Sequence, residues 1–251
     1  MKTICILNNK GGVGKTSSVL NIGGGLSLRG FKVLLIDLDP QMNLTQSLGV
    51  RDPQRDIYGT LTGRYRLSPI QVAENLSIVP SSRELKNIES EFSSKIGGQV
   101  RLRKILSEVE GYDYCLIDCP PSLGLLSINA MTSSQEIIVP LTPEFYSVQG
   151  VISLTETIEE VRENLNPNLR LTGILITLYN KQKIVHRDFA EAIQESFGDI
   201  VYPTRIRSSV AIEESPTQGQ DVFRYSPESN GAKDYSEVID EFLRRCNNVN
   251  L

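Results

Sequence analysis

The sequence predicts an α/β fold, in which residues 1–251 form a single domain with one doubly wound, mostly parallel sheet and helices on both faces. Three observations predict this fold. A length of 251 residues suits one large core. Short apolar runs alternate with helical stretches, which is the pattern of parallel strands joined by crossover helices. The apolar runs are continuous, as expected for strands that are buried on both faces.

The apolar runs predict six strands, which in chain order cover residues 4–7, 33–36, 76–79, 114–117, 136–141 and 171–177. The stretches between and after them predict helices over residues 15–29, 101–110, 145–165, 185–197 and 232–246. Residues 51–68 are rich in Arg, Asp, Gly, Tyr and Pro, and they predict a surface loop with a short helix. Because ligands of such sheets bind at the carboxyl ends of the strands, we expect the functional residues directly after the apolar runs.

Composition and charge exclude several classes of protein. Hydrophobic residues make up 39% and charged residues 22%, as in an ordinary globular protein, and no run reaches the roughly 18 apolar residues of a membrane span. The first apolar run is too short for a signal peptide, so we expect a cytoplasmic protein. The 4 cysteines form no C-x-x-C pair, which argues against a zinc site. Because the net charge is −4, any DNA binding must come from a local basic patch.

A phosphate-binding loop is the strongest motif, and it lies between the first strand and the first helix. It reads Lys10-Gly11-Gly12-Val13-Gly14-Lys15-Thr16-Ser17. Its glycines allow backbone N–H groups to turn inward around phosphate oxygens, and the helix N-terminus adds a partial positive charge. In this pattern Lys15 reaches the β- and γ-phosphates, and the Thr16 hydroxyl ligates Mg²⁺. The position five residues before Gly14 is Asn9 rather than the usual glycine, and a second lysine, Lys10, follows it.

The run KGGVGKTS resembles the deviant Walker A motif of the ParA/MinD family of ATPases. The resemblance covers nearly the whole chain and points to the small, Soj-like ParA proteins that partition or position a cargo. It implies that residues 10–17 bind ATP with Mg²⁺. It also implies that Lys10 crosses a nucleotide-sandwiched homodimer to touch the phosphates of the partner. By the same resemblance Lys10 and Lys15 are both catalytic residues.

Two further motifs supply carboxylates. Asp37 and Asp39 follow the second strand, and their i, i+2 spacing directs both side chains to the same side of an extended chain, where they can meet the water shell of Mg²⁺. The run DLDPQ resembles the first switch of the family; by that resemblance Asp39 positions the attacking water and Asp37 supports the metal shell. The strand over residues 114–117 ends in Asp118, and YCLIDCPPS resembles the Walker B strand and second switch, in which Asp118 holds a water on Mg²⁺. Such a site positions water, metal and charge for phosphoryl transfer.

The resemblance continues to the C-terminus. Residues 139–150 look like the family's VPxxxEYxSLxG segment, and residues 173–180 resemble the strand whose end approaches adenine. Residues 205–216 resemble a loop that reads IPRN…EAPS in the family, but here its Pro-Arg-Asn is replaced by Arg-Ser-Ser. Nucleotide contacts by Asn180 and Arg207 are implied by this likeness.

The C-terminal third also bears on DNA binding. Residues 225–232 match a family stretch that reads YDPRSRGA in chromosome-type members, but both of its DNA-binding arginines are lost here. A nonspecific DNA surface needs several phosphate contacts. The remaining basic candidates are Lys181, Lys183, Arg187, Arg205, Arg207, Arg224 and Lys233.

The family resemblance implies a cycle. An ATP-bound homodimer binds double-stranded DNA without sequence preference, so it associates with the nucleoid. A ParB-like or cargo-adaptor activator protein then triggers hydrolysis and release. The cargo is a plasmid, a chromosome origin or a protein organelle such as a carboxysome.

Two other functions stay open at this point. A MinD-like regulator cycles on the membrane through a basic amphipathic C-terminal helix. This chain ends EVIDEFLRRCNNVNL, with several acids and two arginines, which predicts a docked helix and no membrane partner. An electron-transfer ATPase resembling nitrogenase iron protein needs two loop cysteines per chain for its cluster, and Cys119 is the only candidate. The single histidine, His186, is predicted to be an ordinary surface residue.

Overall fold

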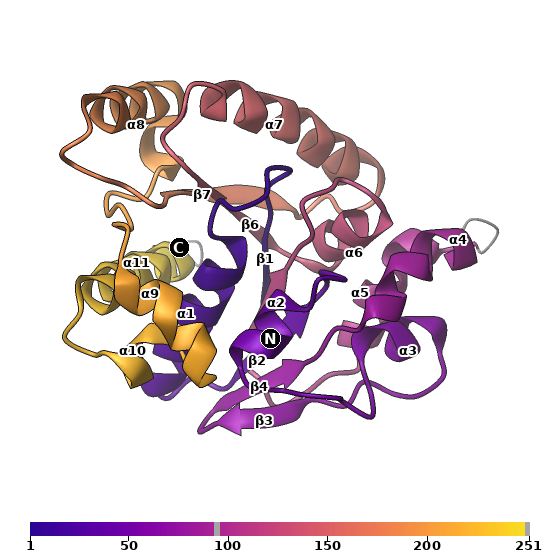
Figure 1. Cartoon of the computed structure of the whole chain (residues 1–251). Helices are drawn as coiled ribbons and strands as arrows, with labels where there is room; N and C mark the ends of the chain where they lie inside the picture. Colours follow the sequence, from indigo (N-terminus) through magenta and orange to yellow (C-terminus); the bar gives the residue numbers. More distant parts are fainter. Residues whose placement is uncertain (93–95, 249–251) are drawn as a thin grey trace.

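The computed structural model describes residues 1–92 and 96–248, and a seven-stranded sheet runs through this part of the chain. The strands are β1 (Lys2–Ile6), β2 (Val33–Asp37), β3 (Ile70–Ala73), β4 (Leu76–Val79), β5 (Tyr114–Asp118), β6 (Glu136–Leu141) and β7 (Arg170–Ile176). Their spatial order is β3-β4-β2-β5-β1-β6-β7, and all neighbours are parallel except the edge pair β3 and β4 (Figure 1). The predicted mostly parallel sheet is confirmed, and β3 is the strand that the apolar pattern missed.

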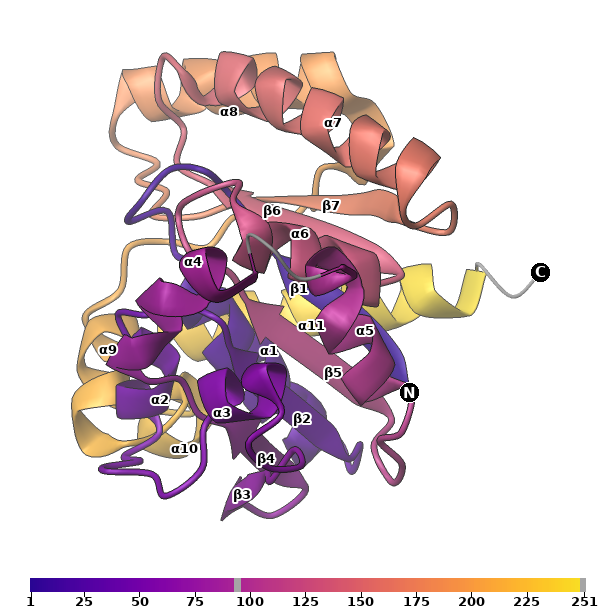
Figure 2. The same cartoon turned by 90° about the vertical axis from the view of Figure 1, so that its right-hand side faces the viewer.

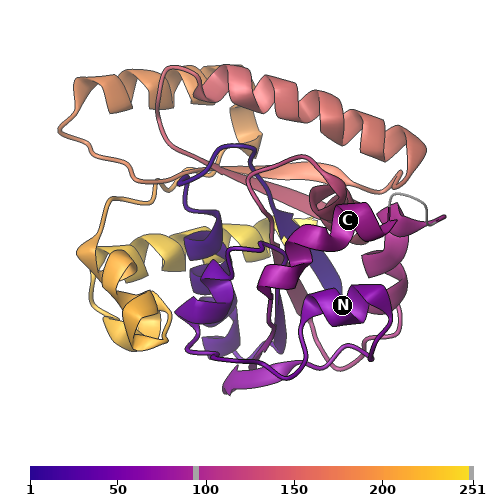
Figure 3. The ribbon, with the colours of Figure 1, turned by 45° about the vertical axis from the view of Figure 1, so that its right-hand side comes forward.

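Helices cover both faces of the sheet, as predicted (Figures 1 and 3). Those expected from the sequence are α1 (Lys15–Leu28), α3 (Ile57–Thr62), α5 (Arg101–Leu106), α7 (Ser147–Asn164), α8 (Ile184–Phe197) and α11 (Asn230–Asn248). The shorter helices that the pattern missed are α2 (Asn43–Ser47), α4 (Ile88–Phe92), α6 (Leu125–Ser133), α9 (Val210–Glu214) and α10 (Val222–Tyr225). Four 3₁₀ turns in the described residues are η1 (Arg83–Asn87), η2 (Gly98–Val100), η3 (Gly198–Ile200) and η4 (Ser215–Gln218).

Two apolar clusters, one on each face of the sheet, make up the core. One cluster joins the sheet to α3, α5, α6, α7 and α8, and the other joins it to α1, α2, α9, α10 and α11. Helices α7 and α8 lie side by side over the β7 edge (Figure 2). The continuous apolar strands fit this arrangement, because every residue of β2, β5 and β6 except Tyr114 is buried between the two clusters.

Helix α1 packs unusually close to its neighbours because it carries the run Gly23-Gly24-Gly25. A Cβ atom added at Gly23 would lie 2.6 Å from the Leu35 side chain of β2, and Cβ atoms at the next two glycines would overlap Asp221 and Ile239. Each glycine costs about 1 kcal/mol of helix propensity relative to alanine. The close approach explains why the sequence has glycine at these three positions of α1. It also fixes the position of α1 relative to the sheet.

The central strands place their carboxyl ends together. In the parallel registers, Asp37 of β2 and Ile6 of β1 both pair with Asp118 of β5. The loop from β1 to α1 and the segment after β2 therefore meet the end of β5. The residues of the predicted phosphate and metal site were expected at this edge of the sheet, and the structure places these residues there.

Candidate nucleotide-binding site

The loop between β1 and α1 has the backbone shape of an anion cradle. Gly12 and Gly14 take left-handed backbone conformations, with φ of 72° and 81°, which residues other than glycine rarely adopt. Cβ atoms added at Gly11 and Gly12 would meet no atom within 4 Å, so the space in front of the loop is open. Val13 is buried, and its carbonyl accepts a hydrogen bond of 2.8 Å from the Thr177 hydroxyl. This bond fixes the loop to the end of β7.

Lys15 begins α1 and turns back under the loop. Its side chain is buried, and its ammonium donates a hydrogen bond of 2.9 Å to the Lys10 carbonyl. Burial lowers the pKa of Lys15, while the nearby Asp118 and Asp39 carboxylates oppose that shift. The ammonium therefore sits between the cradle and two acids, which is where a phosphate group would need a counter-charge. The adjacent Ser17 is half-buried in the first turn of the helix.

Thr16 and Asp118 form the centre of a candidate Mg²⁺ site. The Thr16 hydroxyl donates a hydrogen bond of 2.7 Å to Asp118 Oδ2. Among the described residues, Asp118 Oδ1 is buried and has no hydrogen-bond partner. Burial raises the pKa of Asp118 well above its ordinary value, and the neighbouring Asp37 adds to the shift. An unpartnered buried carboxylate oxygen beside a hydroxyl fits a cation or a water molecule bound to one.

Asp37 supports this centre from β2. Its Oδ2 accepts hydrogen bonds from the Thr45 backbone and hydroxyl, at 2.9 and 2.6 Å, and its Oδ1 accepts one from the Asp39 N–H at 3.0 Å. Burial raises the pKa of Asp37 to about 6. Within residues 1–92 and 96–248, no cluster of three or more His, Cys, Asp or Glu forms a metal cage. Mg²⁺ needs no such cage, because it commonly takes one or two protein ligands together with phosphate oxygens and waters.

Asp39 stands at the start of a strained turn. Its carboxylate accepts the Gln41 N–H at 2.9 Å, and its carbonyl accepts the Ser81 hydroxyl at 2.8 Å. Met42, at the end of this turn, has a φ of 62°, a left-handed value that is uncommon without glycine. The segment from Asp37 to Met42, the predicted first switch, is held to the sheet by Asp37 of β2 and by a bond of 3.0 Å from the Leu38 N–H to the Asp118 carbonyl. Side-chain bonds from Thr45 of α2 and from Ser81 after β4 hold it further.

Lys10 lies at the outer edge of the loop. Its ammonium forms an ion pair with Glu144 of the same chain, and both side chains are about half-exposed. The Lys10 bond is the main cause that lowers the pKa of Glu144. Glu144 lies in the VPLTPEFYSVQG segment that carried part of the family resemblance, but no pattern in the sequence pointed to this ion pair.

Comparison with known proteins agrees with this geometry. A family model described as AAA domain matches residues 1–171. The sporulation initiation inhibitor protein Soj of Bacillus subtilis is 38% identical over 246 residues, which cover 96% of this chain and 97% of that protein. The chromosome partitioning protein ParA of Caulobacter vibrioides is 36% identical over 253 residues, which cover 98% of this chain and 95% of that protein. This chain belongs to the ParA/MinD family of ATPases.

Solved structures show the same fold as this ParA/MinD ATPase. A cobyrinic acid a,c-diamide synthase from Mycobacterium smegmatis, with bound ADP and magnesium, superposes with a TM-score of 0.87 at 31% identity, covering 98% of this chain and 96% of that one. An ATP complex of a Cyanothece McdA variant superposes with a TM-score of 0.86 at 25% identity, covering 97% and 96%. The P-loop fold predicted from the sequence is therefore confirmed.

The structure brings together the two segments in which the sequence predicted adenine contacts. Tyr179 and Arg207 form an isolated parallel bridge, and Asn180 follows directly. The Arg207 guanidinium is bound by Asp234 of α11, with Nε 2.9 Å from Oδ2, so its side chain is already engaged. The Asn180 side chain accepts the Gln182 N–H at 2.9 Å. Contacts of Asn180 and Arg207 with a nucleotide stay predictions.

His186 differs from the surface residue that was predicted. Its Nδ1 accepts a hydrogen bond of 3.2 Å from the Asn180 N–H, and its ring lies 6.3 Å from that of Tyr179. The side chain is half-buried. His186 therefore shapes the turn after β7, and the polar surroundings in the sequence gave no sign of this contact.

The basic residues considered for DNA binding fall into two groups. Lys181, Lys183 and Arg187 are exposed at the start of α8, and none forms an ion pair within the described part of the ATPase. The others are engaged: Arg205 stacks on Tyr179, Arg207 binds Asp234, Arg224 pairs with the buried Asp221, and Lys233 lies 3.7 Å from Glu228. Arg224 is the clearest correction, because its side chain is only 22% exposed and also bonds Ser27.

The alternatives raised from the sequence find no support in the described residues. Cys119 is fully buried, so it cannot reach a cluster between subunits. The C-terminal helix α11 is docked, because the Arg245 guanidinium donates to the carbonyls of Thr172, Ile200 and Val201 at 2.8–3.1 Å. No helix in residues 1–92 and 96–248 is long and apolar enough to cross a membrane.

Proposed function

We propose that this chain, as one P-loop domain, hydrolyses MgATP and acts as a ParA-type switch that positions a cargo. The observation that carries the proposal is the Thr16–Asp118 pair behind an open glycine cradle, with the unpartnered Asp118 Oδ1 beside it. Such an arrangement suits a cation that is brought in by a nucleotide. The similarity to Soj, ParA and McdA supports the choice of a positioning ATPase over other P-loop enzymes.

Each residue of the site has a role in this proposal. MgATP, when bound, supplies the phosphoryl group and the cation that neutralises it. Backbone N–H groups of residues 11–14 orient the phosphates, and the Lys15 ammonium exchanges the Lys10 carbonyl for a phosphate oxygen. Thr16 and Asp118 hold the metal and its water, and Asp37 supports them. Asp39 orients the water that attacks, and its Gln41 N–H bond keeps the carboxylate in place.

The proposed active form is a homodimer. Lys10 is at the outer edge of the cradle and is half-exposed, so it is free to leave Glu144 for the phosphates of a second copy. An exposed ion pair contributes at most about 1 kcal/mol, which a charge-assisted bond to phosphate outweighs. Formation of the dimer then depends on bound ATP, and hydrolysis ends it.

The proposed partners are double-stranded DNA and an activator protein. Lys181, Lys183 and Arg187 provide three exposed cations per protomer around the start of α8, and none of them forms an ion pair with a residue that the structure describes. A dimer doubles this number, and nonspecific binding grows steeply with the number of phosphate contacts. A ParB-like or cargo-adaptor protein triggers hydrolysis, which releases the dimer from the nucleoid and allows a plasmid, a chromosome origin or a protein organelle to be positioned.

Steady-state hydrolysis and molar mass test the core of the proposal. The purified protein should hydrolyse ATP slowly in Mg²⁺ and should not do so in EDTA. Light scattering should show a monomer with ADP and a dimer when hydrolysis is blocked. A protein that binds ATP without metal dependence, or that never dimerises, would contradict the proposed switch.

A further inference from the structure

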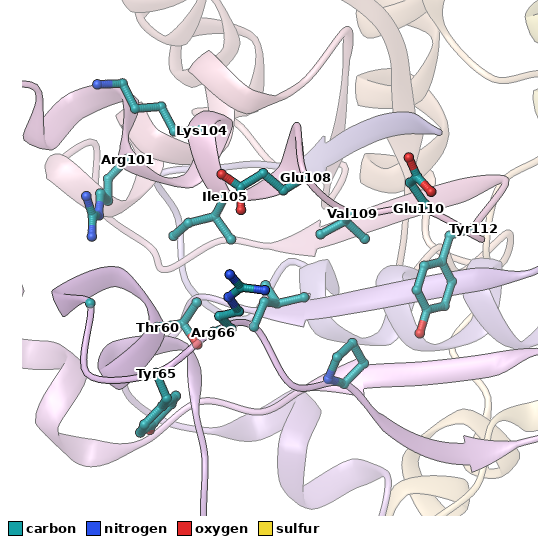
Figure 4. Close-up of a pocket in the computed structure, with 13 residues that line it drawn as sticks. Thr60, Tyr65, Arg66, Arg101, Lys104, Ile105, Glu108, Val109, Glu110 and Tyr112 are labelled. Carbon is teal, nitrogen blue, oxygen red and sulfur yellow. The ribbon is translucent and has the colours of Figure 1, made fainter.

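A second concave surface lies away from the phosphate loop. It is a groove of about 720 Å³ between two walls: α3 with the segment after it, and α5 with the segment after it (Figure 4). Tyr112, at one end of the groove, precedes β5, whereas Asp118 of the metal site ends β5. Six residues at about 3.3 Å each put that end of the groove about 20 Å from the metal site along the strand. The groove shares no residue with the nucleotide site.

The floor of the groove is apolar. Leu67, Ile105 and Val109 line it, and all three are partly buried at the edge of the larger core cluster. Here the core reaches the surface without a helix or loop to cover it. When a ligand covers apolar side chains in a concave surface, their removal from water lowers the free energy of the complex.

Charges of opposite sign occupy the two ends. Arg101 and Lys104 lie at one end, and Glu110 lies beside Tyr112 at the other (Figure 4). Between these ends Arg66 and Glu108 carry opposite charges on the two walls, so the middle of the groove has no net charge. The Arg101 guanidinium is held in place because its Nε donates a hydrogen bond of 2.9 Å to the Leu61 carbonyl. Neither Lys104 nor Glu110 forms an ion pair with any residue that the structure describes.

We infer that this groove binds a linear peptide segment of a partner protein. The segment is acidic where it meets Arg101 and Lys104, apolar over Ile105 and Val109, and basic where it meets Glu110. A small-molecule site gathers its polar groups around one point, whereas these are spread along the groove, as an extended chain requires. Nucleic acid is disfavoured, because Glu108 and Glu110 offset most of the positive charge of Arg66, Arg101 and Lys104, whereas phosphate binding needs an excess of cations.

The inferred site needs neither a nucleotide nor a second copy of the chain. None of the residues that line it belongs to the phosphate loop or to its carboxylates, so a partner docked there leaves the phosphate loop open. The inference therefore goes beyond the proposed ATPase cycle and can fail while that cycle stands. Opposite charges at the two ends also fix the direction in which the segment lies.

A random peptide library displayed on phage tests the inference with the full-length protein as bait. The selected peptides should share the order acidic, apolar, basic. A fluorescein-labelled synthetic copy of one should bind with equal affinity with and without MgATP in an anisotropy titration. Val109→Lys should weaken that binding at least tenfold while its ATP affinity and thermal midpoint stay those of the wild type.

Charge reversal at one end gives the sharper test. Selection on Lys104→Glu should enrich peptides with basic rather than acidic residues at that end. The matched control is Lys86→Glu, an exposed lysine of η1 that lines no part of the groove, and it should select the wild-type pattern. The inference is overturned if no common pattern emerges, if the pattern is the same on Lys104→Glu, or if Val109→Lys binds the peptide as well as the wild type.

Discussion

Asp37 and Asp118 are register partners at the ends of neighbouring strands, and both carboxyl groups are fully buried. Burial raises the pKa of both groups, and the Asp37 carboxylate raises the pKa of Asp118 further. In the nucleotide-free protein these two groups therefore carry an electrostatic cost. A divalent cation at this place would remove that cost, so we expect metal binding and stability to be linked.

The first prediction concerns Asp118→Asn, measured in EDTA without nucleotide. The change replaces a carboxyl group whose ionisation is disfavoured by burial, and it keeps an oxygen that accepts the Thr16 bond. At pH 8 the variant should be more stable than the wild type by about 1–3 kcal/mol, which for a chain of this size raises the thermal midpoint by roughly 2–10 °C. In a parallel assay without EDTA, MgATP should stabilise the wild type and fail to stabilise the variant.

The pH dependence of that difference has a definite sign. In the unfolded chain a carboxyl group loses its proton near pH 4. In the folded protein the pKa of Asp37 is raised to about 6, and the pKa of Asp118 is raised well above its ordinary value. The folded state binds more protons in this window, so the free energy of unfolding of the wild type falls as the pH rises through it. The advantage of Asp118→Asn should therefore be lost below about pH 4. A variant that is less stable than the wild type at pH 8 would contradict the buried charge.

The second prediction concerns Lys15→Ala. Lys15 is the buried cation under the cradle, and in the free protein its ammonium bonds only a carbonyl among the described residues. Its loss should weaken MgATP binding at least 100-fold, about 2.7 kcal/mol, because charge-assisted bonds to phosphate disappear. Isothermal titration with a nonhydrolysable ATP analogue measures the affinity. Wild-type affinity in this variant would remove Lys15 from the phosphate site.

The third prediction separates binding from hydrolysis. Asp39→Ala leaves the phosphate cradle intact but removes the carboxylate that orients water, so the variant should bind ATP, hydrolyse it at least tenfold more slowly and accumulate as a dimer. Light scattering with ATP shows the mass, and a phosphate-release assay shows the rate. A monomeric variant, or one that hydrolyses at the wild-type rate, would exclude this role of Asp39.

The fourth prediction compares Lys10→Ala with Glu144→Gln. Lys10→Ala should bind ATP with nearly wild-type affinity but neither dimerise tightly nor hydrolyse, because the cation that reaches the second copy is gone. Glu144→Gln only frees Lys10 from an exposed ion pair worth at most about 1 kcal/mol, so it should change the dimer affinity by less than about fivefold. If Glu144→Gln abolished dimerisation, Glu144 itself would be part of the interface.

The sequence predicted the buried strands well because each is a continuous apolar run between helices. The position of the phosphate loop and its carboxylates was predictable too. Each follows an apolar strand directly, and the carboxyl ends of parallel strands meet at one edge of the sheet. Strand β3, Ile70–Ala73, was missed because three of its residues are only partly buried, Gln71 is exposed, and the strand pairs only at the sheet edge. Helix α6 was missed because its residues are buried almost all round, which leaves no polar face to mark a helical period.

Side-chain partners were harder to predict than the elements. Arg224 and Arg207 read as surface cations, but Asp221 and Asp234 bind them in the folded chain. The Arg207–Asp234 pair depends on how α11 packs beside the end of β7, and no local pattern carries that information. The same is true of the Lys10–Glu144 pair, whose partners are 134 residues apart in the sequence. The Arg224–Asp221 pair has i, i+3 spacing at the start of α10, so this one was within reach of the sequence.

The last prediction concerns DNA. Replacing Lys181, Lys183 and Arg187 by Glu removes the three exposed cations at the start of α8, while leaving the Arg207–Asp234 pair in place. In an Asp39→Ala background locked with ATP, gel shifts on unrelated duplexes should weaken to the same extent for every sequence. Three lost contacts per protomer should reduce the slope of log affinity against log salt by about 5 for the dimer.

The matched control, with Lys32, Lys86 and Arg83 replaced by Glu, carries the same charge change on other elements and should bind as before. Equal loss in both triple variants would assign the effect to net charge, and no shift at low salt in the locked parent would exclude nucleoid binding by this chain.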